Sequence, residues 1–128
     1  MEKHVEINWN SLPDKAMLLA DKTQMNRLFT NLFQNAVEAC NGREQCMINV
    51  TEAQEDGTIT VSVKDNGLGI PPDIQSKIFA PNFTTKSSGT GLGLAMCKGI
   101  VEQAHGEIWF ETTAGEGTAF YVKLPLAN

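Results

Sequence analysis

The sequence predicts one α+β domain, a two-layer sandwich in which helices cover one face of a mixed sheet of about five or more strands. Several short stretches alternate apolar and polar residues, which is the pattern of half-buried strands. Two longer stretches are helical in character, and glycine-containing turns separate the elements. A chain of 128 residues suits a single domain with its own core, so residues 1–128 are expected to form one unit.

The composition narrows the class of protein. Apolar residues make up 41% of the chain, yet no apolar run approaches the ~20 residues that span a bilayer, so we expect a cytoplasmic domain without direct membrane contact. The net charge of −5 argues against nucleic acid as the main partner. Cys40, Cys46 and Cys97 lack metal-binding spacing and are odd in number, so we expect reduced cysteines without a chemical role.

The first third of the chain contains two predicted strands and a long helix. Residues 4–8 alternate like an edge strand and residues 16–20 resemble a second, which predicts an N-terminal hairpin. Asp21 is expected to cap a helix that continues to about Cys40, before an Asn-Gly stop signal. The apolar positions that predict packing of this helix on the sheet are Met25, Leu28, Leu32 and Ala36.

Two asparagines stand out in that helix. Asn31 and Asn35 are four residues apart on one face, and Glu38 follows one turn later. A solvated polar side of an amphipathic helix would explain them. Alternatively, because an amide oxygen is a suitable hard ligand, Asn35 binds Mg²⁺ together with phosphate oxygens and water.

The clearest strand covers residues 58–64 and follows another at residues 46–53 through a hairpin turn at residues 55–57. It leads into Asp65-Asn66-Gly67-Leu68-Gly69. Asn-Gly is a common hairpin signal, but two prolines follow and cannot continue a central strand. A carboxylate at a strand end beside glycines could instead accept a hydrogen bond from the amino group of a flat ring such as adenine.

A short helix is predicted over residues 72–78, followed by an irregular segment at residues 79–88. Irregular connections of this length are typically functional lids or disordered pieces, and Phe79 and Phe83 favour a lid because they could pack on the body of the domain. Lys86 could supply positive charge for phosphate oxygens, although loop lysines are commonly solvated.

A glycine loop opens the second helix, which is predicted over residues 95–104. Gly89, Gly91 and Gly93 at alternate positions let the backbone approach a ligand, and the amide groups of a helix start favour phosphate. A flexible linker before a helix would also explain the glycines. Two last strands at residues 107–111 and 118–124 are expected to form a hairpin around residues 115–117.

Four of these segments resemble a known set of motifs. Residues 31–39, 65–69, 79–83 and 89–94 are similar to the N, G1, F and G2 boxes of the gyrase, Hsp90, histidine kinase and MutL ATPase superfamily, in the same order. The resemblance implies the Bergerat fold, with ATP and Mg²⁺ between the long helix and the lid. The residues that it implies for this site are Asn31, Asn35, Asp65, Gly67, Gly69, Ile70, Phe79, Phe83, Thr85, Lys86, Gly89, Thr90, Gly91, Leu92, Gly93, Leu94 and Thr118.

The resemblance also implies roles. Asn35 would bind Mg²⁺, Asp65 would accept a hydrogen bond from the adenine amino group, and Thr118 would lie beside both the adenine and Asp65. The glycines of residues 89–93 would hold the phosphates. Asn31, Asn35 and Lys86 would be the catalytic residues, acting by positioning and neutralising the phosphates.

Asn31 distinguishes between branches of the superfamily. Gyrase-type ATPases and anti-sigma serine kinases resemble each other in having a glutamate at this position, where it acts as a general base, and an amide cannot do so. A histidine acceptor scarcely needs a base, so the chain looks like the catalytic domain of a sensor histidine kinase of the nitrogen-regulation type. Neither His4 nor His105 lies in a phosphoacceptor motif. We therefore expect the acceptor histidine on a separate dimerisation domain, with a response regulator downstream. Two alternative functions for this domain are a non-catalytic nucleotide-sensing module and a stand-alone serine kinase or ATPase.

Overall fold

The computed structural model describes residues 4–10, 22–40, 45–80 and 93–125. Its elements, in chain order, are β1 (His4–Asn10), α1 (Lys22–Ala39), β2 (Gln45–Glu55), β3 (Thr58–Asp65), the 3₁₀ helix η1 (Gln75–Lys77), α2 (Gly93–Gln103), β4 (Glu107–Thr113) and β5 (Gly117–Pro125). Among these residues no helix is long and apolar enough to cross a membrane.

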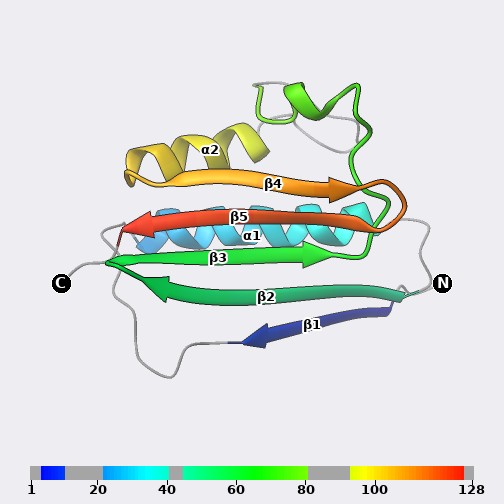
Figure 1. Ribbon diagram of the computed structural model, residues 1–128, viewed down its shortest axis with the longest axis horizontal. Helices are drawn as coiled ribbons and strands as arrows, with labels where there is room; N and C mark the ends of the chain where they lie inside the picture. Colours follow the sequence, from blue (N-terminus) through cyan, green and yellow to red (C-terminus); the bar gives the residue numbers. More distant parts are fainter. Residues whose placement is uncertain (1–3, 11–21, 41–44, 81–92, 126–128) are drawn as a thin grey trace.

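The strands form one sheet in the order β1-β2-β3-β5-β4. The pairs β2–β3, β3–β5 and β5–β4 are antiparallel, and the edge strand β1 is parallel to β2. Helix α1 lies behind the sheet in Figure 1, and the side chains of β2, β3 and β5 that alternate into the core face it. The α+β class with helices packed on a largely antiparallel sheet is confirmed.

Two local predictions differ from the structure, and one is untested. β1 pairs with β2, beginning at His4 opposite Gln45, while the predicted strand at residues 16–20 lies outside the described residues and leaves the hairpin untested. The predicted helix at residues 72–78 is only the 3₁₀ turn η1, whose hydrogen bonds join residues three apart, such as Lys77 N–H to the Ile74 carbonyl (2.9 Å). Helix α2 begins at Gly93, two residues earlier than expected.

The β2–β3 hairpin is confirmed. Asp56 and Gly57 both have positive φ, 48° and 78°, as a two-residue turn that matches strand twist requires. Strand β2 then pairs with β3 from Glu55 opposite Thr58 to Ile48 opposite Asp65. This long, well-paired hairpin fixes where β3 ends, and therefore where Asp65 lies.

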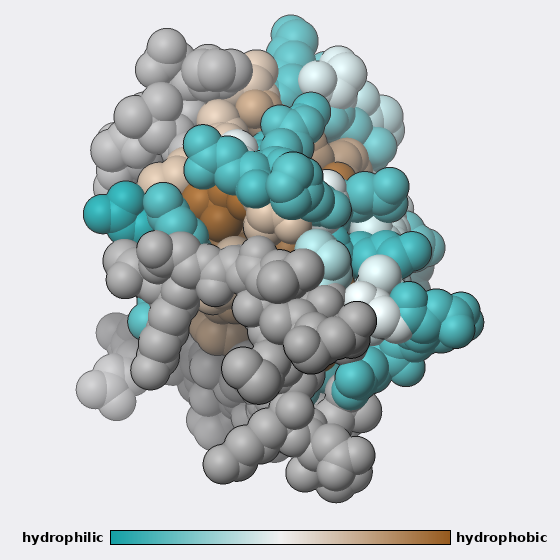
Figure 2. Space-filling model, turned by 90° about the vertical axis from the view of Figure 1, so that its left-hand side faces the viewer, coloured by the Kyte–Doolittle hydropathy of each residue, from teal (hydrophilic) through white to brown (hydrophobic). Residues whose placement is uncertain are grey.

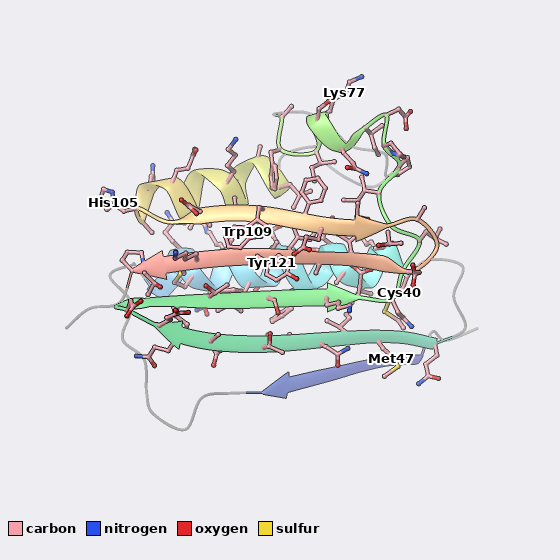
Figure 3. All side chains as sticks on the ribbon, viewed as in Figure 1. Cys40, Met47, Lys77, His105, Trp109 and Tyr121 are labelled. Carbon is pink, nitrogen blue, oxygen red and sulfur yellow. A yellow bond between two sulfur atoms is a disulfide. The ribbon has the colours of Figure 1, made fainter. Side chains whose placement is uncertain are left out.

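The core lies between the helices and the sheet. The four predicted apolar positions of α1 are all buried, as are Cys97, Ile100 and Val101 of α2. Figure 2 shows the end of the molecule opposite Asp65, where most coloured residues are hydrophilic and apolar ones appear in a limited central area. The other face of the sheet carries the ring of Trp109, which is 37% exposed and stacks on Tyr121 with the centroids 5.4 Å apart (Figure 3).

One prediction about the cysteines is wrong. Cys40 and Cys46 form a disulfide that joins the end of α1 to the start of β2, with their Cα atoms 5.5 Å apart. The fold brings these two element ends together, which a spacing of six residues does not reveal by itself. Cys97 is free and buried, and burial raises the pKa of its thiol to about 12.

Candidate functional site

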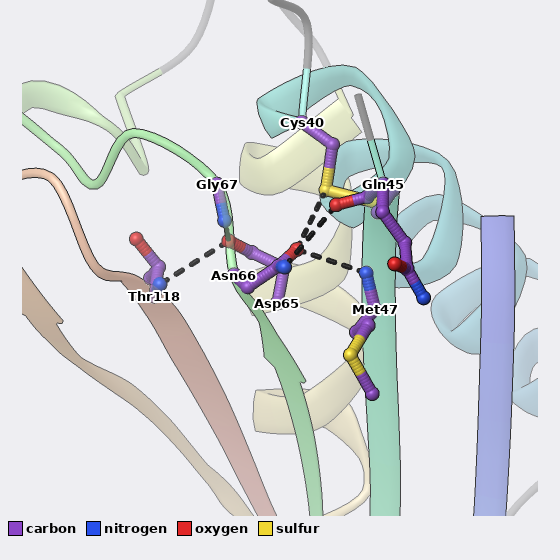
Figure 4. Close-up of a disulfide and its surroundings, with 8 residues drawn as sticks. Cys40, Gln45, Met47, Asp65, Asn66, Gly67 and Thr118 are labelled. Atoms are coloured by element: carbon purple, nitrogen blue, oxygen red, sulfur yellow. Dashed lines mark hydrogen bonds between the residues drawn. A yellow bond between two sulfur atoms is a disulfide. The ribbon is translucent and has the colours of Figure 1, made fainter. Parts of the chain in front are cut away.

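Asp65 is a buried acid at the end of β3. Its side chain is 3% exposed. One carboxylate oxygen, Oδ1, accepts hydrogen bonds from the backbone N–H groups of Gly67 (2.8 Å) and Thr118 (3.2 Å), as Figure 4 shows. The other oxygen, Oδ2, has no hydrogen-bond partner among the residues that the structure describes. Buried carboxylate oxygens are normally paired, so Oδ2 is a candidate acceptor for a ligand.

Burial and hydrogen bonding shift the pKa of Asp65 in opposite directions. Burial raises the pKa of Asp65 above its ordinary value, and the hydrogen bonds from Gly67 and Thr118 lower it again in part. A desolvated carboxylate that two N–H groups orient is a strong acceptor, because little water competes for its free oxygen. This arrangement is suited to an amino group on an otherwise apolar ligand.

Gly67 and Gly69 shape the chain that follows Asp65. A Cβ atom at Gly67 would collide with the carbonyl oxygen of Ala39, at the end of α1. Gly69 has φ +83°, and a Cβ atom there would lie 2.7 Å from the carbonyl oxygen of Thr113. The two glycines therefore let this segment run closely between α1 and the β4–β5 hairpin.

Hydrogen bonds fix the same segment on both sides. Leu68 N–H donates to the Ala39 carbonyl (3.2 Å), and Gly115 N–H donates to the Leu68 carbonyl (2.9 Å). Ile70 N–H donates to the Thr112 hydroxyl (2.9 Å). The chain beyond Asp65 is thus held by α1 and by the β4–β5 hairpin together.

The structure places Thr118 beside Asp65, as the family resemblance implied. Its side chain is 3% exposed, and its hydroxyl lies 2.9 Å from the Thr112 hydroxyl. Thr112 was missed by the sequence analysis. The signal was present in principle, since both are threonines on β4 and β5, but only the strand register reveals that they lie directly opposite each other.

The two predicted asparagines of α1 are half-buried. Asn31 Nδ2 donates to the Arg27 carbonyl (2.8 Å), and its Oδ1 lies 3.4 Å from where a Cβ atom of Gly93 would be. Asn35 is one turn further along, one turn before Ala39. The asparagine-bearing part of α1 therefore extends from the start of α2 toward the segment after Asp65.

Phe79 anchors the chain that follows η1. Its ring packs against Phe110 and Phe120, with centroids 6.1 and 6.3 Å apart, and Lys98 Nζ lies 5.8 Å from the ring centroid. The expectation that Phe79 packs on the body of the domain is confirmed. Gly93 and Leu94 form the first residues of α2. The predicted site residues that lie outside the described residues are Phe83, Thr85, Lys86, Gly89, Thr90, Gly91 and Leu92.

This fold, with a buried acid at the end of a central strand, belongs to an ATPase class, as the family match shows. The family described as "Histidine kinase-, DNA gyrase B-, and HSP90-like ATPase" matches residues 20–128, and the chain belongs to this family. The predicted resemblance to histidine kinase catalytic domains is confirmed by the relatives as well. The chain is 35% identical over 129 residues to the sensor protein FixL of Bradyrhizobium diazoefficiens, covering 99% of this chain and 25% of FixL.

Solved structures show the same fold. The catalytic domain of histidine kinase ThkA superimposes with a TM-score of 0.82 at 34% identity, covering 94% of this chain and 80% of that domain. Full-length ShkA in complex with AMPPNP gives a TM-score of 0.82 at 28% identity, covering 97% of this chain and 26% of ShkA. The chain spans between 17% and 26% of the length of the curated relatives named in the comparison.

Proposed function

We propose that this domain binds Mg·ATP and transfers the γ-phosphate to a histidine on a separate dimerisation domain of a sensor kinase. The observation that carries the proposal is the carboxylate of Asp65, with Oδ1 held by two backbone N–H groups and Oδ2 without a partner among the described residues. The complex of ShkA with AMPPNP and the names of the relatives support the same reading.

The adenine ring is recognised by a hydrogen-bond acceptor, the carboxylate of Asp65. The 6-amino group of adenine donates to Asp65 Oδ2, and burial of the carboxylate strengthens this hydrogen bond. A hydrogen bond to a charged group contributes about 1.5–3 kcal/mol. Guanine and hypoxanthine present a carbonyl oxygen at the corresponding position, so the site favours adenine by repelling them.

Asn35 is the proposed metal ligand. The residues of the described ranges contain no group of three His, Cys, Asp or Glu side chains that could hold an ion. A single amide oxygen fits Mg²⁺, which commonly takes few protein ligands and is otherwise held by phosphate oxygens and water. When bound, the ion neutralises charge on the phosphates.

The remaining residues position the nucleotide. Asn31, whose Oδ1 lies 3.4 Å from where a Cβ atom of Gly93 would be, is a neutral amide and cannot remove a proton. A neutral imidazole already has a free lone pair, so the reaction requires alignment rather than a base from this domain. Lys86 and the glycines of residues 89–93 are proposed to hold the terminal phosphates.

Phosphotransfer can be tested by mixing this domain with the phosphoacceptor domain of its parent kinase and γ-labelled ATP. We expect acid-labile, base-stable label on histidine, passed on to a response regulator, and no label with Asn35→Ala. Binding of ATP without labelling would indicate a nucleotide-sensing module. Acid-stable label on serine, or release of phosphate by the domain alone, would indicate a serine kinase or an ATPase.

A further inference from the structure

The Cys40–Cys46 disulfide lies beside Asn66, in the chain that follows the buried acid of the candidate site (Figure 4). The Asn66 amide bonds to the backbone of β2 on either side of Cys46. Its Oδ1 accepts a hydrogen bond from Met47 N–H (2.9 Å), and its Nδ2 donates to the Gln45 carbonyl (3.2 Å). The start of β2 therefore holds the chain after the acid on one side.

The other cysteine belongs to the element that holds the same chain from the helix layer. Cys40 directly follows Ala39, whose carbonyl accepts a hydrogen bond from Leu68 N–H (3.2 Å). The same carbonyl lies so close to Gly67 that a Cβ atom there would collide with it. The disulfide is thus the covalent link between two elements that each hold the segment after the acid.

The surroundings of the disulfide suit both of its redox states. Cys40 Sγ lies 3.5 Å from Asn66 Oδ1. A disulfide sulfur has no proton to donate, whereas a Cys40 thiol could donate a weak hydrogen bond to that oxygen. An acceptor for the reduced form is therefore already in place. The sequence predicts a cytoplasmic domain, and disulfides of cytosolic proteins are usually transient and catalytic or redox-sensing.

We propose that the Cys40–Cys46 pair is a redox switch for the nucleotide site, in which the disulfide form binds ATP more tightly than the dithiol form. This inference rests on the proposed ATP site. The disulfide fixes the spacing of the two elements that hold the segment after Asp65, so a bound ligand does not have to order them. Reduction removes this constraint, although the hydrogen bonds to Asn66 and Leu68 can remain.

The switch exchanges two electrons and two protons with a dithiol reductant. A thiolate of the reductant bonds to one cysteine sulfur, and the S–S bond breaks so that the other sulfur leaves as a thiolate and takes up a proton. The second thiolate of the reductant then displaces the first cysteine, which is protonated in turn, and the reductant is released as its own disulfide. The oxidised reductant reverses both steps. Because both cysteines are buried, exchange requires local opening, so the two states are compared at equilibrium.

The test measures the Kd for Mg·ATP by calorimetric titration in buffers of reduced or oxidised dithiothreitol. Reduction should weaken binding about fivefold or more, as is usual for two coupled sites. Because such coupling is reciprocal, saturating ATP should raise by the same factor the ratio of reduced to oxidised dithiothreitol that half-reduces the disulfide, as measured by alkylation and mass spectrometry.

Two variants assign the response to this pair. Cys46→Ala cannot form the bond and should bind ATP like the reduced wild type in both buffers. Cys97→Ala is the matched control, since Cys97 is the free cysteine, and it should keep the full response.

The outcomes separate this inference from its alternatives. Equal ATP affinity in the two redox states, tighter binding by the reduced form, or a response that persists in Cys46→Ala would overturn the proposal. Weaker binding that accompanies a loss of helix in circular dichroism would show general destabilisation and would also overturn it. If Cys46→Ala does not fold, the shift that ATP causes in the redox titration of the wild type decides the question.

The proposed function fails by a different result. A wild-type domain that binds ATP in neither redox state would refute the proposed function and this inference with it. ATP binding that does not depend on the redox state would overturn only the switch.

Discussion

Asp65→Asn tests the base site most directly, because asparagine has the shape of aspartate without its charge. The asparagine oxygen can still accept both backbone hydrogen bonds, from Gly67 and Thr118. The amide nitrogen replaces Oδ2, so a donor then faces the 6-amino donor of adenine. The substitution removes the protein oxygen that accepts a hydrogen bond from the ligand, and it keeps the hydrogen bonds that the side chain makes with Gly67 and Thr118.

The size of the effect follows from this exchange. Losing a hydrogen bond to a charged acceptor costs about 1.5–3 kcal/mol, which is about 10- to 150-fold in the Kd for ATP. Folding should not suffer at neutral pH. Burial disfavours the charged form of Asp65, as its raised pKa indicates, so a neutral residue is at least as stable there.

Calorimetric titration with ATP and inosine triphosphate, together with urea unfolding, measures both effects. We expect Asp65→Asn to lose ATP affinity, to bind inosine triphosphate as well as or better than the wild type, and to keep its free energy of unfolding. Asp73→Asn is the control, since it makes the same charge change at an exposed position. Wild-type ATP affinity in Asp65→Asn, or an equal loss for both nucleotides, would refute adenine recognition by this carboxylate.

The other predictions concern the metal, the cysteines and pH. Asn35→Ala should abolish the gain in ATP affinity on adding Mg²⁺ while binding in EDTA is unchanged, and a full Mg²⁺ response would contradict its role. Reducing the Cys40–Cys46 disulfide, whose partners are six residues apart, should lower the free energy of unfolding by about 2 kcal/mol in urea titrations with and without reductant; coincident curves would contradict this. The folded, oxidised domain should not react with a thiol reagent at about pH 8, since the pKa of Cys97 is about 12, and urea should expose one reactive thiol. Because the pKa of Asp65 is raised above 3.8, the stability of the wild type relative to Asp65→Asn should be greatest below pH 3.8 and fall as pH rises through the folded-state pKa; a rise over that range in acid-to-neutral unfolding measurements would show the opposite sign.

Local patterns predicted much of the fold. The apolar spacing of α1 identified its buried face, because a helix repeats its faces within a few residues. The strict alternation of residues 58–64 identified the strand that leads into Asp65, and the four motifs in order identified the family. Each of these features is encoded within a short stretch of chain.

Features that depend on distant partners were not predicted. The parallel pairing of β1 with β2 joins residues about forty positions apart, as His4 opposite Gln45 shows, and neither strand signals its partner. The disulfide depends on how α1 enters β2. The contact between the Thr112 and Thr118 hydroxyls depends on the register between β4 and β5. The phosphate-binding roles of Lys86 and of the glycines at residues 89–93 remain predictions.

The direct contact between Gly67 and the end of α1 has a consequence for which ligands can fit. The main chain after Asp65 touches the Ala39 carbonyl without any intervening side chain, and Leu68 N–H bonds to that carbonyl. Asn35 is only four residues before Ala39 in the same rigid helix. In the proposed site, the distance between the purine and the cation would therefore depend on how closely these two main-chain segments approach each other. A nucleotide that needs a longer separation would require the segment after Asp65 to move away from the end of α1.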